Sequence, residues 1–269
     1  MKVAKVIPHF GEEPPLSGSK GSGTIFFSHC NLRCRFCQNY QISQLGKGDE
    51  MTPQELSEKM LSLQETGCHN ISLVTPTPYL PQAMRAVWLA KASGLKVPIV
   101  YNTNGYERID ILRLLEGAVD VYLPDAKYGS NEASSFSSHV DDYVKFNIPA
   151  LKEMKRQVGN LVLNGSGVAE KGFIVRHLVL PNNTADSFSL LRVLGDELGT
   201  EIHISLMGQY FPRYKATGTK ELNRRLTDEE FEGYCRFLES MGFENGWIQY
   251  PDGVDGDFLP DFEIKDGWN

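Results

Sequence analysis

Three cysteines lie within eight residues of one another, and they are the side chains of this chain best suited to chemistry. Cys30, Cys34 and Cys37 have the spacing Cys-x3-Cys-x2-Cys and follow the apolar run 24–27, which is typical of a strand. Soft thiolates in one short loop are ligands for zinc or for an iron–sulfur cluster. Both kinds of site usually have four protein ligands, whereas this loop supplies three. We therefore interpret the loop as an iron–sulfur site with one iron left open.

A structural zinc site is the alternative, and its fourth ligand would have to come from His29, Cys68 or Cys235. Cys68 follows Gly67 at the end of a helical stretch, and Cys235 lies in an apolar helical pattern. Both are expected to be small buried residues. Two isolated cysteines cannot hold a second cluster. Five cysteines, three of them clustered, fit a reducing compartment better than a disulfide framework.

Composition excludes several classes of function. The chain has 269 residues, of which 41% are hydrophobic and 23% charged, so it can bury a sizeable core. It contains no run of the roughly 18 apolar residues that a membrane span needs, and its amino terminus does not resemble a signal peptide. The net charge of −7 offers no general attraction to nucleic acid. We expect a cytoplasmic protein with no membrane and no nucleic-acid partner.

Strands and helices alternate along the chain after the cysteine loop. Thr52, Pro53 and Glu55 have the pattern of a capping box and predict a helix start. The predicted strands are 24–27, 70–75, 97–101, 119–123, 173–180 and 201–207, and the later predicted helices are 81–93, 108–115, 141–158, 185–198 and 228–241. Six β/α repeats predict an α/β fold with a parallel sheet, as a partial (β/α)6 TIM-like barrel in a single domain.

The domain boundaries that we predict are an irregular extension at 1–23, a core at 24–245 and a tail at 246–269 packed on that core. The extension is rich in glycine and proline and is expected to be either a solvated leader or a segment across the mouth of the barrel. The loop 127–140 is expected to be either an active-site cover or a plain solvated loop. The stretch 251–257 superficially resembles a calcium loop but lacks its glutamate and spacing, so we expect no calcium there.

Polar residues gather where the predicted strands end, and in a parallel barrel the chemistry lies at those carboxyl ends. The third strand ends in residues 101–106, the fourth in 123–127, and the sixth in 207–210, while Arg176 lies within the fifth. Asn and Asp also favour turns, but their joint occurrence at several strand ends favours a functional rim.

The cysteine spacing, with Phe36 just before the last cysteine, resembles that of the radical S-adenosylmethionine (SAM) superfamily. Further blocks resemble the activases of glycyl radical enzymes, and most closely the iron–sulfur proteins similar to pyruvate formate-lyase activating enzyme. These blocks are 22–28, 37–40, 74–76, 101–106, 122–125 and 176–181. The resemblance covers roughly residues 10 to 240 and does not specify the substrate.

The resemblance implies a role for each matching residue. Cys30, Cys34 and Cys37 would bind a [4Fe–4S] cluster, and the amino and carboxylate groups of SAM would chelate its open iron. The backbone at Phe36 would meet the adenine, and Arg176 would face the ribose or carboxylate region. The full set of SAM-binding residues that we predict is Phe36, Asn39, Thr75, Asn102, Asn104, Asp125, Lys127, Arg176 and Tyr210.

The chain departs from the activase pattern at three places. Asn102 stands where activases have an aspartate ligand of a monovalent cation, which argues against that cation here. Residues 75–78, Thr-Pro-Thr-Pro, replace the Gly-Gly-Glu that receives the SAM amino group, and Gln209-Tyr210 replaces a histidine. We therefore expect a retained cofactor site and an altered substrate side.

The implied activity is reductive cleavage of SAM to methionine and a 5′-deoxyadenosyl radical, which abstracts hydrogen from a substrate. A flavodoxin or ferredoxin would supply the electron. The substrate would be a glycine of a partner glycyl radical enzyme or, alternatively, a small molecule or peptide. A non-catalytic metal-binding interaction protein is the alternative of another class.

Overall fold

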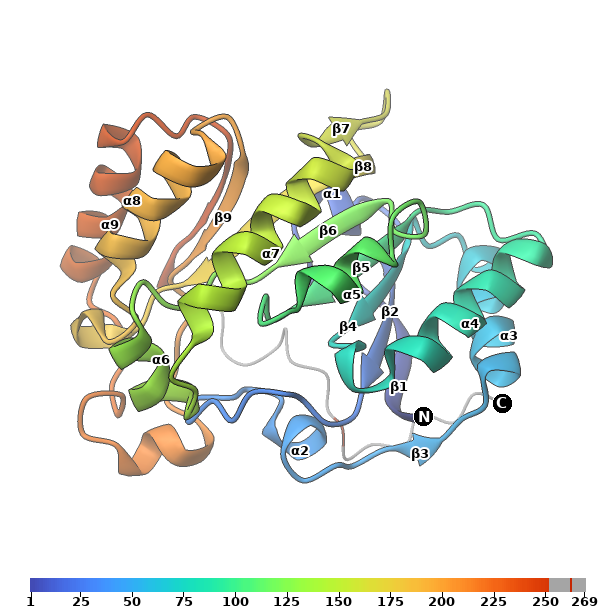
Figure 1. Cartoon of the computed structure of the whole chain (residues 1–269), viewed down its shortest axis with the longest axis horizontal. Coiled ribbons are helices and arrows are strands. Elements are labelled where there is room, and N and C mark those ends of the chain that lie inside the picture. Colours follow the sequence, from blue (N-terminus) through green and yellow to red (C-terminus); the bar gives the residue numbers. More distant parts are fainter. Residues whose placement is uncertain (252–261, 263–269) are drawn as a thin grey trace.

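The computed structural model describes residues 1–251 and 262, and its framework is a largely parallel β-sheet (Figure 1). The strands follow the order β10-β9-β8-β6-β5-β4-β2-β1-β3. The parallel strands are β2 (Ser22–Phe27), β4 (Ile71–Val74), β5 (Ile99–Thr103), β6 (Val121–Pro124), β8 (Ala169–Leu178), β9 (His203–Met207) and β10 (Gly246–Gln249). The predicted α/β fold with a parallel sheet is confirmed, and the arrangement is compatible with a partial barrel.

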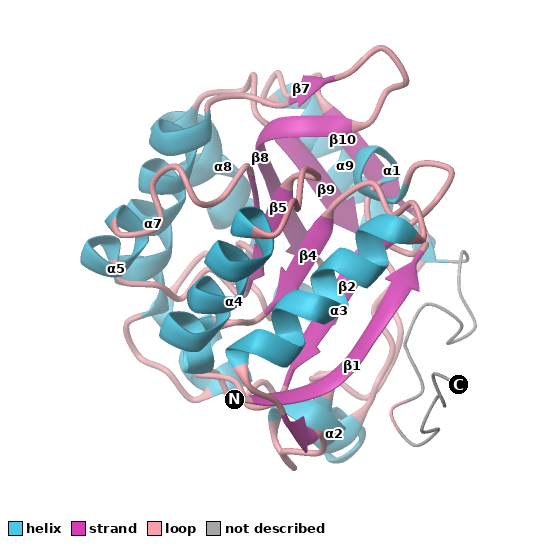
Figure 2. Cartoon of the chain, turned by 90° about the vertical axis from the view of Figure 1, so that its right-hand side faces the viewer, coloured by secondary structure: helices cyan, strands magenta, loops and turns pink. Residues whose placement is uncertain are grey.

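Helices connect the parallel strands. Most of them cover the outer face of the sheet, and two short ones lie at the carboxyl ends of the strands, beside the cysteine loop (Figure 1). The helices are α2 (Tyr40–Ser43), α3 (Pro53–Glu65), α4 (Leu80–Ala92), α5 (Ile109–Arg113), α6 (Asn131–Ser138), α7 (Tyr143–Val158), α8 (Ser187–Leu198) and α9 (Asp228–Ser240). Figure 2 shows α3 and α4 lying side by side over the sheet. The predicted capping box is present: the Thr52 hydroxyl accepts from the Glu55 backbone N–H, and Glu55 accepts from Thr52 in return.

Two apolar layers hold the outer face of the sheet to its helices. Leu56, Met60 and Leu63 of α3 are fully buried against Ile25 and Leu73 of the strands. On the other half, one aromatic side chain from each of β5, β6 and β8 points outward and packs against α5, α7 and α8; they are Tyr101, Tyr122 and Phe173. Their neighbours in sequence point to the inner face, because side chains alternate along a strand. The register aligns Phe26, Val74, Asn102 and Leu123 in one row near the carboxyl ends.

The prediction that residues 1–23 are irregular is wrong. Residues 2–9 form β1 (Lys2–His9), which pairs antiparallel with β2 and with the short β3 (Asp49–Glu50). The prediction missed this strand because its pattern is weak: Val3 and Val6 are buried, but Pro8 interrupts the alternation.

Residues 10–17, which we call the floor segment, close the barrel at the amino ends of its parallel strands. They include the short helix α1 (Pro14–Ser17), whose Leu16 is fully buried among the inward side chains of the sheet, such as Val100, Val121 and Ile174. The Leu16 carbonyl accepts from the side chain of Asn70, which directly precedes β4. The segment therefore enters at the amino ends of the strands, at the opposite end from the mouth where one of our alternatives placed it.

The loop at 127–140 and the start of the tail at 246 contain secondary structure that we did not predict from the sequence. Residues 127–140 are not a plain loop, since they contain α6, and the Ser137 carbonyl accepts from the Arg35 backbone N–H in the cysteine loop. Residues 246–249 are a strand of the sheet, β10, which pairs parallel with β9. The calcium-like stretch from 252 onward lies outside the described residues. Across the part of the chain that the structure describes, no helix is both long and apolar enough to span a bilayer.

Candidate functional site

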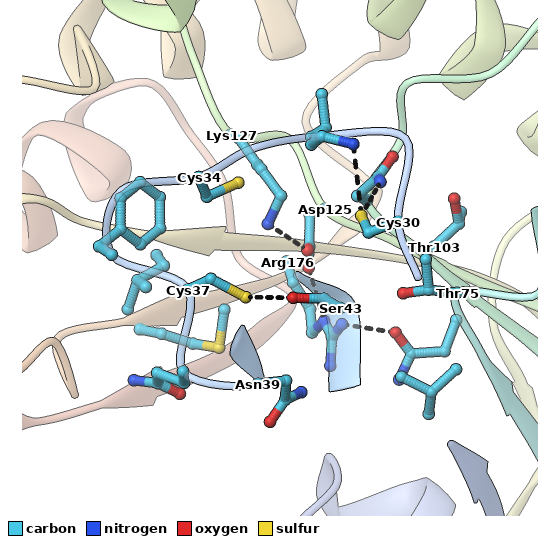
Figure 3. Close-up of a pocket in the computed structure, with 18 of the residues that line it drawn as sticks. Cys30, Cys34, Cys37, Asn39, Ser43, Thr75, Thr103, Asp125, Lys127 and Arg176 are labelled. Carbon is cyan, nitrogen blue, oxygen red and sulfur yellow. Dashed lines mark hydrogen bonds and ion pairs between the residues drawn. The ribbon is translucent and has the colours of Figure 1, made fainter. Parts of the chain in front are cut away.

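The cysteine loop directly follows β2 and lies across the carboxyl ends of the parallel strands. Cys30, Cys34 and Cys37 line one cavity of about 300 Å³, and all three are free thiols. Figure 3 shows their side chains spread along the loop, around a common space. In the described residues no three His, Cys, Asp or Glu side chains are arranged to hold a single metal ion.

A hydroxyl or amide group contacts each thiol. Asn104 donates its side-chain N–H to Cys30 Sγ at 3.2 Å, and the Ser138 hydroxyl donates to Cys34 Sγ at 2.9 Å. Cys37 Sγ lies 3.1 Å from the Ser43 hydroxyl. Hydrogen bonds to sulfur are the contacts that stabilise thiolate ligands and tune the potential of an iron–sulfur cluster. The donor set therefore fits a cluster held by three thiolates.

The thiols of Cys30 and Cys37 are hard to ionise without a metal. Burial and the neighbouring Cys34 raise the pKa of Cys37 to about 12, and the same two causes raise the pKa of Cys30. Metal binding replaces the thiol proton, so the site would release protons as it is loaded.

A network of charged side chains lies in the cavity, between the cysteine loop and the floor segment. Asp125 accepts from Lys127 Nζ at 2.6 Å and from Arg176 Nε at 2.9 Å. Burial opposes the ionisation of Asp125, but Arg176 and Lys127 outweigh it and lower its pKa. The carboxylate is therefore ionised at neutral pH and holds both cations in place. Figure 3 shows Lys127, Asp125 and Arg176 together beside the cysteine loop.

The last residues of β5 and the segment that follows it bring two asparagines into this network. Asn102 accepts from Arg176 Nη2 at 2.6 Å, and Asn104 contacts both Cys30 and Asn31. Gly105 has φ +73°, and a side chain there would collide with the Asp125 carbonyl. This glycine lets the segment after β5 approach the end of β6, so that Asn104 and Asp125 reach the same cavity.

Thr75, Phe36 and Asn39 also line the cavity, from different segments. Thr75 has φ +55°, which for a β-branched residue is an outlier that costs about 1–3 kcal/mol and is typical of ligand sites. Its backbone N–H donates to the Asn102 carbonyl at 2.8 Å. Asn39 Oδ1 is buried without a hydrogen-bond partner among the described residues. These positions suit the cofactor contacts that we predict for them.

The predicted role of Tyr210 does not agree with the structure. Its hydroxyl donates to the Leu222 carbonyl at 2.7 Å, and the residue is buried outside the cavity lining. Its ring packs edge-on against Phe36, with the ring centroids 6.1 Å apart. Tyr210 therefore supports Phe36, while the neighbouring Gln209 and Phe211 line the cavity.

Sequence reasoning missed Glu12 and Glu13 of the floor segment, both of which line the cavity. Glu12 Oε2 lies 3.4 Å from Arg176 Nη1, and Glu12 Oε1 accepts from Asn102 at 3.3 Å. The only signal in the sequence is the acidic pair before Pro14-Pro15, which is as common in exposed turns.

The alternative zinc ligands lie elsewhere. Cys68 is buried in the layer between α3, α4 and the sheet, and Cys235 is buried in the layer around α9. Neither lines the cavity, and His29 does not line it either.

Comparisons with known proteins agree on the family. Residues 24–191 match the model of the radical SAM superfamily, which is more than half of the chain. The uncharacterized protein MJ0674 of Methanocaldococcus jannaschii is 34% identical over 247 residues, which cover 88% of this chain and 66% of that protein.

Solved structures share the fold at low sequence identity. Streptococcus suis SuiB bound to its precursor peptide SuiA has a TM-score of 0.54 and 11% identity, covering 83% of this chain and 47% of that one. The structure of anSMEcpe with bound AdoMet has a TM-score of 0.54 and 13% identity, covering 82% of this chain and 61% of that one. This chain thus spans less than two thirds of the length of these relatives. The family match, the cysteine spacing and the shared fold together show that the chain belongs to the radical SAM superfamily.

Proposed function

We propose that this protein is an enzyme that cleaves SAM reductively and uses the resulting radical to abstract hydrogen from a substrate. The observation that carries the proposal is that three thiols from one loop line a single cavity at the carboxyl ends of the strands. A [4Fe–4S] cluster held by Cys30, Cys34 and Cys37 would supply the electron that splits SAM into methionine and a 5′-deoxyadenosyl radical.

The protein's own contribution is to orient SAM and to exclude water. Asp125, ionised and held between Lys127 and Arg176, fixes the two cations in the wall of the cavity. Either cation can receive the carboxylate of SAM, and a guanidinium can do so through two parallel hydrogen bonds. Phe36, braced by Tyr210, offers an apolar wall to the adenine.

The substrate and the partners belong to the same proposal. The resemblance to glycyl-radical-enzyme activases supports a glycine Cα of a partner enzyme as the hydrogen donor, and a flavodoxin or ferredoxin as the electron source. A small molecule or peptide is the second candidate. The charged floor of the cavity favours it, because Glu12 and Glu13 supply recognition that a glycine without a side chain does not need.

Anaerobic reconstitution tests the proposal. We expect an electron paramagnetic resonance (EPR) signal of a reduced cubane cluster that changes on adding SAM, together with 5′-deoxyadenosine detected by chromatography. Cys34→Ala should lose the signal and the product. Cys68→Ala is the matched control, since it removes a buried cysteine outside the cavity, and it should retain both. Bound zinc with no cluster and no cleavage would instead indicate a non-catalytic metal-binding protein.

A further inference from the structure

The cavity carries more negative charge than its two cations can balance. Three carboxylates line the cavity, from Glu12, Glu13 and Asp125, against the cations Lys127 and Arg176. Lys127 pairs with Asp125, and Arg176 is shared between Asp125 and Glu12. With all five groups ionised, the cavity has one uncompensated negative charge.

Glu13 is the carboxylate without a full complement of partners. The residue is 2% exposed, and its Oε2 atom has no hydrogen-bond partner among the described residues. Its carboxyl group also interacts with the Ser205 side chain. A buried carboxylate oxygen without a partner costs free energy that a fold does not normally bear unless a ligand satisfies it.

Electrostatics point to the sign of that ligand. Burial raises the pKa of Glu13 to about 6, despite the attraction of Arg176, and burial likewise raises the pKa of Glu12. At neutral pH Glu13 is still largely ionised, so a positive group beside it would be stabilised in the low-dielectric interior. A protonated amine carries such a charge and has three donors for the carboxylate oxygens.

Glu13 lies deeper in the cavity than the cysteine loop. Ser205 lies two residues before Met207, the last residue of β9, which places it about 7 Å below the carboxyl end of the strand. The cysteine loop lies above those carboxyl ends. Since Leu16 is buried at the amino ends of the strands, Glu13 lines the end of the cavity opposite the cysteine loop.

We propose that the lower part of the cavity binds a protonated amine of the substrate, with Glu13 as its main counter-charge and Glu12 as the second. This inference rests on the proposed function only in taking the bound amine to be the substrate of the radical reaction. It assigns the floor segment to substrate recognition, and it excludes SAM's own amino group as the occupant.

The reconstituted protein, with SAM bound, is the material for the test, and n-butylammonium chloride is the probe. Saturation-transfer NMR measures the binding of n-butylammonium and, for comparison, of a neutral and an anionic analogue of equal length, n-butanol and butyrate. We expect the ammonium alone to bind, at millimolar concentration. Equal binding of all three, preferred binding of butyrate, or displacement of the ammonium by an equal concentration of KCl would overturn the proposal.

Glu13→Gln keeps the shape of the side chain and removes its charge. It should weaken butylammonium binding about 10- to 100-fold, the range for losing a hydrogen bond to a charged group, with the affinity for SAM unchanged. Glu153→Gln is the matched control, because Glu153 is a buried carboxylate on α7 outside the cavity, and it should change neither. A loss of SAM affinity in Glu13→Gln as large as the loss of probe binding would assign Glu13 to the cofactor and refute the inference.

The pH dependence gives a second measurement on the wild-type protein. Binding of the ammonium should strengthen about tenfold between pH 5 and pH 7, as Glu13 ionises with a pKa of about 6. The other titratable groups of the cavity wall are Glu12, Asp125, Lys127, Arg176, His9 and the three cysteines. Burial lowers the pKa of His9, which disfavours its cationic form. A flat profile would contradict the role of Glu13.

The two proposals fail separately. A protein that makes no 5′-deoxyadenosine but binds the ammonium through Glu13 would refute the proposed function and leave the amine site standing. A protein that cleaves SAM but shows no preference for the ammonium would refute the amine site alone.

Discussion

The cysteine loop and the floor segment face the same cavity from opposite ends, yet they differ in how they are built. In the loop, three residues of one type lie within eight positions, and their chemistry follows from their spacing. In the floor segment, the role that we propose for Glu12 and Glu13 depends on their proximity to Arg176, which lies more than 160 positions away in the chain. A local motif thus specifies the cofactor end of the cavity, and a long-range contact specifies the other end.

Arg176 is the side chain that joins the two regions. It contacts Asp125 of the rim, Asn102 of β5 and Glu12 of the floor segment. Burial opposes its charge, but the surrounding carboxylates raise its pKa further, so it stays cationic. We therefore expect a substitution of Arg176 to affect both ends of the cavity. A substitution in the cysteine loop or in the floor segment should affect only its own end.

The largest effect is expected for Arg176→Met. Removing the cation leaves buried carboxylates without their partner, which should destabilise the fold by about 3–5 kcal/mol. Urea unfolding measures the loss, which should shrink as the pH falls and the carboxylates become protonated. Arg108→Met is the control, since Arg108 forms an exposed pair with Asp110 and should change stability little. Equal stability of the two variants would mean that Arg176 does not join the regions.

Leu16→Ala tests whether the floor segment can be weakened without disturbing the loop. Deleting most of a fully buried leucine should cost about 2–5 kcal/mol. The EPR signal of the reconstituted cluster should persist at temperatures where the variant is folded. Loss of that signal in the folded variant would show that the two ends of the cavity are not independent.

Glu13→Gln tests the charge of the floor by its effect on stability. Its pKa is raised from 4.5 to about 6 in the folded protein, so the native state binds the proton more tightly than the unfolded state does. The ionisation of Glu13 should therefore lower the stability of the wild-type protein by about 2 kcal/mol as the pH rises from about 3.5 to about 7. The Glu13→Gln variant has no carboxyl group to ionise at this position, so it should be more stable than the wild-type protein above pH 6. Urea titrations of both proteins across this range, without added amine, give the difference, and parallel curves would contradict the buried charge.

Asn104→Ala should have the smallest effect, confined to the cofactor end. It removes the amide that donates to Cys30 Sγ, at a cost of about 1 kcal/mol in stability. Hydrogen bonds to the sulfur ligands stabilise the reduced cluster, so the variant should have a lower reduction potential. A redox titration followed by EPR measures it, and butylammonium binding should be unchanged. A raised potential would contradict the donor role of Asn104.

The alternation of strands and helices could be predicted because each element repeats its apolar residues with its own period. The helix over 53–65 also carries a local start signal in Thr52, Pro53 and Glu55. Helix α6 could not be predicted, since its sequence Asn-Glu-Ala-Ser-Ser-Phe-Ser-Ser has little helix propensity. It is held instead by its Ser130 cap and by contacts with the cysteine loop, which serine-rich sequence does not signal.

The sequence by itself determined the cysteine loop, the six β/α repeats and the strand-end residues from Asn102 to Arg176, because these depend on short spacing or on periodicity. Only the tertiary structure decided that Tyr210 faces Leu222 rather than the cavity, and that β1 completes one side of the sheet. It also decided that an acidic pair beside two prolines lies inside the barrel. The physical reason is the same in each case: the environment of these side chains is made by segments remote in sequence, and no local pattern records which of them will meet.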